Sequence, residues 1–385
     1  MRGCRLAGTV RGLVDGGGAG GRDGGRFWFA RLQGGALTGW VTSELPAALP
    51  DWLRARGAAQ AQLQERAAAV ARAQFGRRVF VRAVVEVSNH CRENCAYCGM
   101  RRDNRDLDRF RARHEELAEL LIHHRPGCVT DVNIQAGEDP VAVREVVLPL
   151  LRTLRRETSL GLSVCLGTLS PGLYAELQSA GASVYILKFE LAEAAAYQAL
   201  GAPGTLEERV QHLRHLAASG WHVSSGFIAG LPGQAEEGLA ANFALAAGLP
   251  LSGCSVSPFI PGEATPLRGR PGADLDLALN CMAALRLVRP HWVIPAVSAL
   301  QLAGSGEGYE RGLAMGANLV TINLTPSSVR TDYLLYRRDR QVMTEERVLG
   351  ALGRAGLEAS EQSLASYWDE ARAGAGGGSR VMAAL

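Results

Sequence analysis

The chain lacks the features that would assign it to a membrane, secreted or nucleic-acid-binding class. No apolar run among its 385 residues reaches the roughly 18 residues of a membrane span, and no apolar leader with a cleavage site is recognisable. Lysine is nearly absent, since Lys188 is the only lysine among 41 basic residues. The formal net charge is +3, and the arginines are dispersed among carboxylates. We therefore expect a cytoplasmic protein with neither a nucleic acid nor a membrane as partner.

Cysteines are too few and too scattered for a disulfide framework, but three of the eight stand close together. Cys91, Cys95 and Cys98 form a CxxxCxxC spacing, with Tyr97 directly before the last cysteine. Three thiolates on one loop indicate a metal centre, and an iron-sulfur cluster leads because it can leave one iron without a cysteine ligand. A zinc site completed by His90 is the alternative. The other five are interpreted as small core residues: Cys4, Cys128, Cys165, Cys254 and Cys281.

Composition and periodicity divide the chain into four expected parts. A flexible glycine-rich arm spans 1–50, an N-terminal helix spans 51–76, a barrel spans 77–345, and helices with a flexible tail span 346–385. From residue 79 onward, β-rich runs alternate with amphipathic segments, which is typical of βαβ units. Eight such pairs predict an α/β fold, a TIM-type (β/α)8 barrel, with a partial barrel as the alternative. The expected strands are 79–87, 129–135, 161–166, 183–190, 222–229, 252–259, 292–297 and 318–323.

Polar residues follow the expected strands, where a barrel places its active site. Glu138 and Asp139 come after the second strand behind Gly137, which allows close backbone approach. Two carboxylates here can bind an ammonium group, although the same residues are also a common turn into a helix. Arg209 lies on the expected helix after the fourth strand and could reach a ligand carboxylate. The simpler interpretation is an arginine on the exposed face of that helix.

Lys188 and Glu190 end the expected fourth strand and face the same side, because side chains alternate along a strand. In a barrel that side is the interior, where a charge needs a partner or a ligand. Two interpretations stay open: a structural ion pair, or a Glu190 that accepts hydrogen bonds from a ligand while Lys188 balances its charge. After the fifth strand, Gly226 and Gly230 expose backbone that suits a flat adenine edge.

Three further polar residues at expected strand ends are candidates for substrate contact. Ser298 follows the seventh strand, and Asn323 and Thr325 end and follow the eighth. We expect a rigid, mostly apolar loop at 258–267 to form one wall of the cavity inside the barrel.

The whole pattern resembles the radical S-adenosylmethionine (SAM) superfamily. A CxxxCxYCG motif after a first barrel strand, with Gly-Glu-Asp after the second, carries the resemblance. Residues 82–111 are similar to the branch that contains biotin synthase, the methylornithine synthase PylB and, most closely, the FeFe-hydrogenase maturase family HydE. Further stretches are similar to HydE in order: 135–140, 186–190, 226–234, 258–267, 294–300 and 316–326. The resemblance covers about residues 55–345.

This resemblance implies that Cys91, Cys95 and Cys98 hold a 4Fe-4S cluster whose open iron binds SAM. One electron, from a donor such as ferredoxin or flavodoxin, would cleave SAM to methionine and a 5'-deoxyadenosyl radical that acts on a small-molecule substrate. Glu138 would meet the SAM amino group and Arg209 its carboxylate. The full set of implied cofactor-binding residues is Tyr97, Gly137, Glu138, Asp139, Lys188, Glu190, Arg209, Gly226, Ile228, Gly230 and Leu231.

The residues disfavour sulfur insertion of the biotin synthase kind, which needs a second cluster with three more cysteines. Cys165 stands where one would lie, but Ser224 occupies another of these places and 131–135 offers no cysteine. Where HydE usually has two threonines, this chain has Val297 and Ser298. A HydE-like maturation role is expected, with a PylB-like amino-acid mutase or a natural-product enzyme as alternative. A non-catalytic metal-binding scaffold is the rival from a different class.

Overall fold

The structure is a computed structural model that describes residues 45–304, 306–338 and 341–376. The expected glycine-rich arm lies outside the described residues except for 45–50, and the end of the expected tail lies outside them as well. The four expected domain boundaries therefore stay a prediction.

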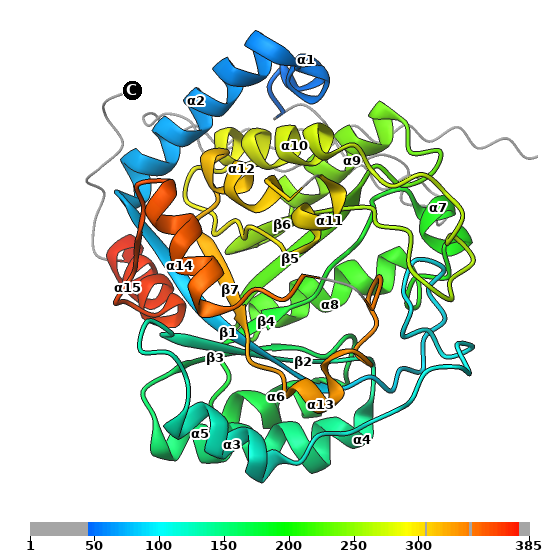
Figure 1. Ribbon diagram of the computed structural model, residues 1–385, viewed down its shortest axis with the longest axis vertical. Helices are drawn as coiled ribbons and strands as arrows, with labels where there is room; N and C mark the ends of the chain where they lie inside the picture. Colours follow the sequence, from blue (N-terminus) through cyan, green and yellow to red (C-terminus); the bar gives the residue numbers. More distant parts are fainter. Residues whose placement is uncertain (1–44, 305, 339–340, 377–385) are drawn as a thin grey trace, which may run out of the picture. The chain divides into compact units, whose positions relative to one another are not determined.

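A parallel sheet that curls into a barrel forms the centre of the described chain (Figure 1). Its strands lie in the order β6-β5-β4-β3-β2-β1-β7, and every neighbouring pair is parallel. The strands are β1 (Arg78–Ser88), β2 (Asp131–Ala136), β3 (Gly161–Cys165), β4 (Val184–Ile186), β5 (His222–Ala229), β6 (Gly253–Pro258) and β7 (Leu319–Asn323). A short β8 (Glu358–Ala359) pairs with the start of β1.

The segment around Val293 and Pro295 closes the barrel between β6 and β7. Val293 pairs with Gly253 of β6, and Pro295 pairs with Leu319 of β7, each through an isolated bridge. The expected strand 292–297 thus occupies its place in the barrel without forming a continuous strand, because proline has no N–H to donate to a ladder. The TIM-type barrel is confirmed, with this correction to its seventh strand.

Helices surround the barrel on the outside. Figure 1 shows α3 and α5 together on one side and α2 with α10 on the other, and both pairs are in contact. The helices are α1 (Leu49–Arg54), α2 (Gly57–Phe75), α3 (His114–His123), α4 (Pro140–Ala142), α5 (Leu148–Glu157), α6 (Pro171–Ser179), α7 (Ala194–Ala199), α8 (Leu206–Ala218), α9 (Glu236–Ala247), α10 (Leu275–Val288), α11 (Ala299–Ala303), α12 (Gly308–Ala314), α13 (Ser327–Arg330), α14 (Glu345–Arg354) and α15 (Leu364–Gly376), with a π-helical turn at Val143–Val147.

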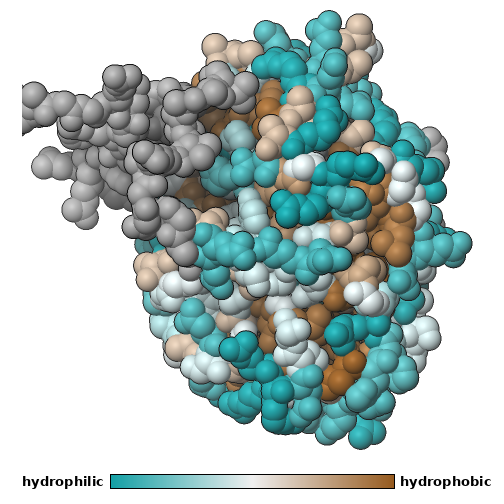
Figure 2. Space-filling view, turned by 90° about the vertical axis from the view of Figure 1, so that its left-hand side faces the viewer, coloured by the Kyte–Doolittle hydropathy of each residue, from teal (hydrophilic) through white to brown (hydrophobic). Residues whose placement is uncertain are grey.

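In the face that Figure 2 presents, hydrophilic residues alternate with small apolar patches. Among the residues that the structure describes, no helix is long and apolar enough to cross a membrane.

Helix α15 covers one end of the barrel, the end at which the strands begin. Leu364 and Trp368 belong to one buried cluster with residues near the starts of three strands, namely Phe80, Val184 and Leu319. The backbone N–H of Leu364 donates to both carboxylate oxygens of Asp131, at 3.0 and 3.1 Å. The ring of His222, at the start of β5, stacks on Trp368 with centroids 5.3 Å apart. This end of the barrel is therefore packed shut, and the other end is left for a site.

Removing the side chain of Leu364 should weaken this closure. Leu364 is 2% exposed, so Leu364→Ala is expected to lower the free energy of unfolding by about 2–5 kcal/mol, measured by urea denaturation. The exposed Val141, at 42%, provides the control, and Val141→Ala should change that energy by no more than about 0.5 kcal/mol. Equal effects of the two substitutions would contradict the packing of α15 against the strands.

Candidate active site

The three cysteines of the motif lie together on the loop that follows β1. Cys95 is buried, and Cys91 and Cys98 are half-buried. Burial raises the pKa of all three thiols, to about 12 for Cys98, and the pKa of Cys95 is raised further by Cys98 and Cys91. The thiols are therefore close enough to affect one another. Because the thiolate is the form that binds a metal, this loop needs a cation whose charge offsets the desolvation.

The absence of a side chain at Gly137 lets this loop, 89–99, lie against the end of β2. A Cβ atom at Gly137 would stand 2.2 Å from the carbonyl oxygen of His90 and 2.9 Å from Cβ of Cys91. The backbone N–H of Glu138 donates to Sγ of Cys91 at 3.4 Å. Arg109, which the sequence did not single out, holds the other side of the loop. It donates to the carbonyl oxygens of Asn89, Met100, Arg101 and Asn104.

The carboxylate of Glu138 is buried at the centre of the site, where three donors hold it and the carboxyl of Glu93 lies against it. Nη2 of Arg92 lies 3.1 Å from Oε2, and Nη2 of Arg209 lies 3.5 Å from Oε1. The backbone N–H of Thr168, after β3, donates to Oε1 at 3.1 Å. The structure thus brings together Glu138 and Arg209, which are far apart in the sequence, and adds Arg92 from the cysteine loop.

Arg209 lies inside the protein and not on an exposed helix face, because its side chain is only 4% exposed. Its helix α8 begins with a capping box between Thr205 and Glu208, which fixes where the first turn points. Nε of Arg209 donates to the hydroxyl of Tyr197 at 3.2 Å. Burial alone would lower the pKa of Arg209, but Tyr197 and Glu138 raise it above its usual value. The guanidinium therefore stays charged beside Glu138.

Asp139 is held by groups that tie the site together. Ser88 donates to Oδ2 at 2.7 Å, Nε of Arg111 lies 2.7 Å from the same oxygen, and the Val141 N–H donates to Oδ1 at 3.2 Å. Burial alone would raise the pKa of Asp139, but the hydrogen bonds from Arg111 and Ser88 hold it below its usual value. These contacts join the end of β1, the chain after the cysteine loop and the start of α4. A cofactor contact of Asp139 stays a prediction.

Glu190 combines backbone strain with an unsatisfied acceptor. Its φ of 62° is in the left-handed region, which is unusual for a residue with a side chain. Nζ of Lys188 lies 4.0 Å from Oε2 of Glu190 and donates instead to Ser257 at 2.9 Å. Oε2 is buried and has no hydrogen-bond partner. The expected ion pair with Lys188 is therefore present, but Oε2 still has no hydrogen-bond donor. The strained backbone and the unpaired oxygen both favour a ligand at Oε2.

The backbone of 226–231 is well ordered by internal contacts. Glu190 pairs with this segment, since the Ile228 N–H donates to the Glu190 carbonyl oxygen at 2.8 Å. The side chain of Gln234 accepts from the Gly230 N–H at 2.7 Å and from the Leu231 N–H at 3.3 Å. Ile228 also lines the cavity described next. An adenine contact by this segment stays a prediction.

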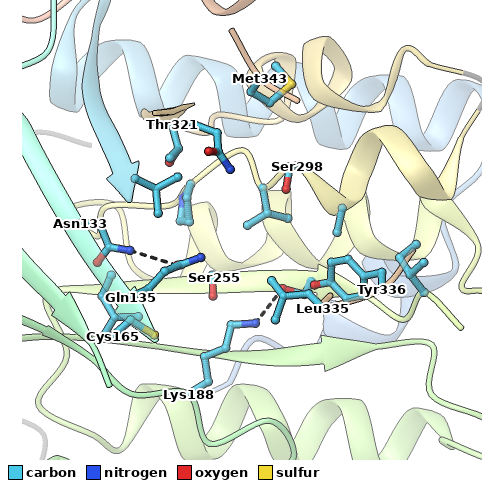
Figure 3. Close-up of a pocket in the computed structure, with 18 of the residues that line it drawn as sticks. Asn133, Gln135, Cys165, Lys188, Ser255, Ser298, Thr321, Leu335, Tyr336 and Met343 are labelled. Carbon is cyan, nitrogen blue, oxygen red and sulfur yellow. Dashed lines mark hydrogen bonds between the residues drawn. The ribbon is translucent and has the colours of Figure 1, made fainter. Parts of the chain in front are cut away.

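A cavity of about 340 Å³ extends from the cysteine loop into the barrel. Tyr97 and Cys98 line it on the loop, and polar side chains line it inside the barrel (Figure 3). Figure 3 shows Lys188, Gln135 and Cys165 pointing into the space that Ser298 and Tyr336 border from the other side. Its volume is in the range of small-molecule sites.

The expected substrate residues divide between two places. Ser298 and Asn323 line the cavity, whereas Thr325 is fully buried, does not line it, and accepts from the Glu86 N–H at 3.0 Å. The interpretation of Cys165 as a core residue is wrong, because its half-buried thiol faces the cavity. Cysteine is neutral and small, so its type alone does not tell a core position from a cavity wall.

Several polar cavity residues were missed by the sequence analysis. They occupy alternate positions of the strands: Arg82 and Glu86 on β1, Asn133 and Gln135 on β2, Ser255 and Ser257 on β6, and Thr321 on β7. The alternation that was applied to Lys188 and Glu190 would have found them, because charged and amide side chains at every second position of a barrel strand face the interior.

Within the described ranges, no three His, Cys, Asp or Glu side chains converge closely enough to hold a single metal ion. In an iron-sulfur cluster each thiolate binds a different iron, so the three sulfur atoms lie farther apart than around a single metal ion.

Comparison with known proteins identifies the family of this chain. Residues 85–246 match the family model of the radical SAM superfamily. The chain is 33% identical over 268 residues to the [FeFe] hydrogenase maturase subunit HydE of Thermotoga maritima. The aligned region covers 69% of this chain and 76% of that protein. The chain belongs to the radical SAM superfamily.

Within this superfamily the chain falls in the branch of HydE, PylB and biotin synthase. It is 27% identical over 287 residues to 3-methylornithine synthase of Methanosarcina barkeri, covering 72% of this chain and 80% of that protein. The crystal structure of methylornithine synthase PylB superposes with a TM-score of 0.74 at 22% identity, covering 86% of this chain and 96% of that one. This likeness shows the shared barrel fold.

Radical SAM enzymes use a 4Fe-4S cluster and SAM, act on small molecules and need a reductant. The residues at the rim fit these two cofactors. Three neighbouring thiols suit a cluster with one open iron, and the buried Oε2 of Glu190 is an acceptor that the protein itself leaves unpaired.

Adding a methyl group at Gly137 should disturb the cysteine loop without unfolding the barrel. Gly137→Ala is expected to reduce iron incorporation several-fold, because the new Cβ would push against the His90 carbonyl oxygen. Gly172→Ala is the matched control, since nothing lies within 4 Å of a Cβ there. Iron content after anaerobic reconstitution, measured alongside circular dichroism, tests this. Normal iron content in Gly137→Ala would refute the close approach.

Proposed function

We propose that this chain is a HydE-like radical SAM enzyme that serves in the maturation of a [FeFe] hydrogenase. The cavity carries the proposal, because it connects Tyr97 and Cys98 on the cysteine loop with polar side chains inside the barrel. A radical formed at the rim would meet a substrate that the barrel walls hold away from bulk water. The identity of 33% to HydE supports this choice within the branch.

We assign Cys91, Cys95 and Cys98 as the cluster ligands. When bound, the cluster supplies the electron that cleaves SAM to methionine and a 5'-deoxyadenosyl radical. Glu138 would accept from the SAM amino group, and Arg209 would donate to the SAM carboxylate. The ion pair between these two side chains, 3.5 Å apart, supports the assignment because it places opposite charges where a zwitterion must bind.

Other residues would orient the remaining parts of SAM. Glu190 would meet the ribose hydroxyls or the sulfonium side of SAM, and Lys188 would balance its charge from 4.0 Å away. Tyr97 and the backbone of 226–231 would lie along the adenine. An electron donor such as ferredoxin or flavodoxin in the cytoplasm would deliver the electron.

Replacing one cluster cysteine should abolish both the cluster and the reaction. After anaerobic reconstitution, Cys95→Ala is expected to lose the broad absorbance of the cluster and to form no 5'-deoxyadenosine on reduction in the presence of SAM. Cys128→Ala should keep both, because this half-buried thiol lies next to Glu345 and away from the cysteine loop. If the unsubstituted protein forms the cluster but no 5'-deoxyadenosine, the enzyme assignment fails.

Neutralising Glu138 should weaken SAM binding. Glu138→Gln removes a charge-assisted hydrogen bond, which is worth about 1.5–3 kcal/mol, so the Kd of SAM should rise about 10- to 100-fold. The control is Glu145→Gln, because Glu145 is an exposed glutamate in the π-helical turn that follows Glu138. This substitution should leave the Kd of SAM unchanged. Isothermal titration of the reconstituted protein measures both, and an equal Kd in the two variants would count against Glu138 as the amino-group partner.

A further inference from the structure

Residues 167–169, which follow β3, lie against the side chain of Glu138. A Cβ atom at Gly167, whose φ is 72°, would stand 2.1 Å from Cγ of Glu138, so only glycine allows this approach. The N–H of Thr168 donates to Oε1 of Glu138, and the carbonyl oxygen of Thr168 accepts from Nη2 of Arg92 at 3.0 Å. The position of the Glu138 carboxylate therefore depends on where the backbone of 167–169 lies.

Two buried tyrosines outside the cavity hold this backbone in place. The hydroxyl of Tyr185, in the middle of β4, donates to the carbonyl oxygen of Gly167 at 2.8 Å. The hydroxyl of Tyr174, on α6, accepts from the N–H of Leu169 at 3.1 Å. The two rings pack edge to face with centroids 5.0 Å apart, and both side chains are buried. Neither tyrosine lines the cavity, so both act on the site through the backbone that they hold.

The hydroxyl proton of Tyr174 has its acceptor on helix α8. Nδ1 of His212 lies 3.1 Å from the Tyr174 oxygen, and the part of the chain that the structure describes offers this proton no other acceptor. Burial raises the pKa of Tyr174 to about 12, so the tyrosine keeps its proton. Because the Tyr174 oxygen already accepts from Leu169, it completes the chain by donating to a neutral His212 whose own proton is on Nε2. A protonated His212 would present an N–H in place of this acceptor.

The surroundings of His212 favour its neutral form. Burial lowers the pKa of this half-buried ring, and Arg209 and His215 on the same helix lower it further. Glu208, also on α8, acts in the opposite direction. The group that faces the ring from α6 is the hydroxyl of Tyr174. The charged groups that act on Tyr174 itself are Arg209, Glu138 and Arg92.

We propose that Tyr174 and His212 are positioning residues, which set the orientation of Glu138 through a hydrogen-bond chain that runs from Nδ1 of His212 through the Tyr174 hydroxyl to the backbone of 167–169. This inference rests on the proposed function, in which Glu138 meets the amino group of SAM. The chain is intact while His212 is neutral, and it is lost as the pH falls through the pKa of His212. Acidification should therefore weaken SAM binding through a side chain that touches neither SAM nor the cysteine loop.

An acceptor that cannot be protonated tests the part played by His212. His212→Asn supplies an amide oxygen in place of Nδ1 and can accept from Tyr174 at every pH. Between about pH 8 and pH 5, the Kd of SAM for the unsubstituted protein should rise about 3- to 10-fold more than that for His212→Asn, the size expected of one neutral hydrogen bond. Isothermal titration of the reconstituted full-length proteins, with iron content checked at each pH, measures this. Equal pH profiles overturn the proposal.

Removing the hydroxyl of Tyr174 tests the other half of the chain. Tyr174→Phe should raise the Kd of SAM about 3- to 10-fold at neutral pH and abolish the part of the pH dependence that His212 contributes. Tyr367→Phe is the matched control, because its hydroxyl bonds to Gln74 at the closed end of the barrel, and it should leave this Kd unchanged. A purely structural Tyr174 would alter thermal stability without changing the pH profile. An unchanged Kd or an unchanged profile in Tyr174→Phe overturns the proposal.

The tautomer of His212 can be measured without SAM, which separates this inference from the proposed function. Nitrogen-15 NMR of the full-length chain with labelled histidines should show a neutral His212 with its proton on Nε2, and the signal that is missing in His212→Asn identifies this residue. A proton on Nδ1 at neutral pH would reverse the hydrogen bond and overturn the chain. If the reconstituted protein binds no SAM at any pH, the proposed function fails, while the Nε2 tautomer still supports the chain that holds Glu138.

Discussion

The buried carboxylate of Glu138 is the contact on which the rest of the site depends. It joins the cysteine loop through Arg92, the end of β3 through Thr168, and helix α8 through Arg209. A carboxylate that is 7% exposed is stable only with such partners. Losing it would remove the carboxylate that Arg92 and Arg209 share, so its contribution to structure and its contribution to cofactor binding cannot be separated by removing the side chain altogether.

Closure of the barrel explains why these contacts meet at one end. Parallel strands deliver all their carboxyl ends to the same rim, while α15 packs Leu364 and Trp368 against the opposite end. Between the two ends lies an interior lined by charged and amide side chains, which is costly unless a ligand uses them. The strained backbone of Glu190 and its unpaired Oε2 are both found along this interior.

The barrel could be predicted from alternating β-rich and amphipathic segments, and the cysteine loop from its spacing alone. Tertiary contacts decided the rest. The sequence could not show that Glu138 and its neighbour Asp139 have different surroundings. Only the fold shows that Arg111 and Ser88 donate hydrogen bonds to the carboxylate of Asp139. It could not show that Thr325 turns away from the cavity, since that depends on pairing with the Glu86 N–H of another strand. Cys165 was misplaced because a thiol suits both a core and a cavity wall.

Electron paramagnetic resonance of the reduced, reconstituted protein with and without SAM tests the central claim most directly, namely that the cysteine loop would hold a cluster and that Glu138 and Arg209 would hold SAM beside it. The account predicts about four iron atoms per chain and a cluster spectrum that changes when SAM is added. A fully loaded cluster whose spectrum is the same with and without SAM would contradict it.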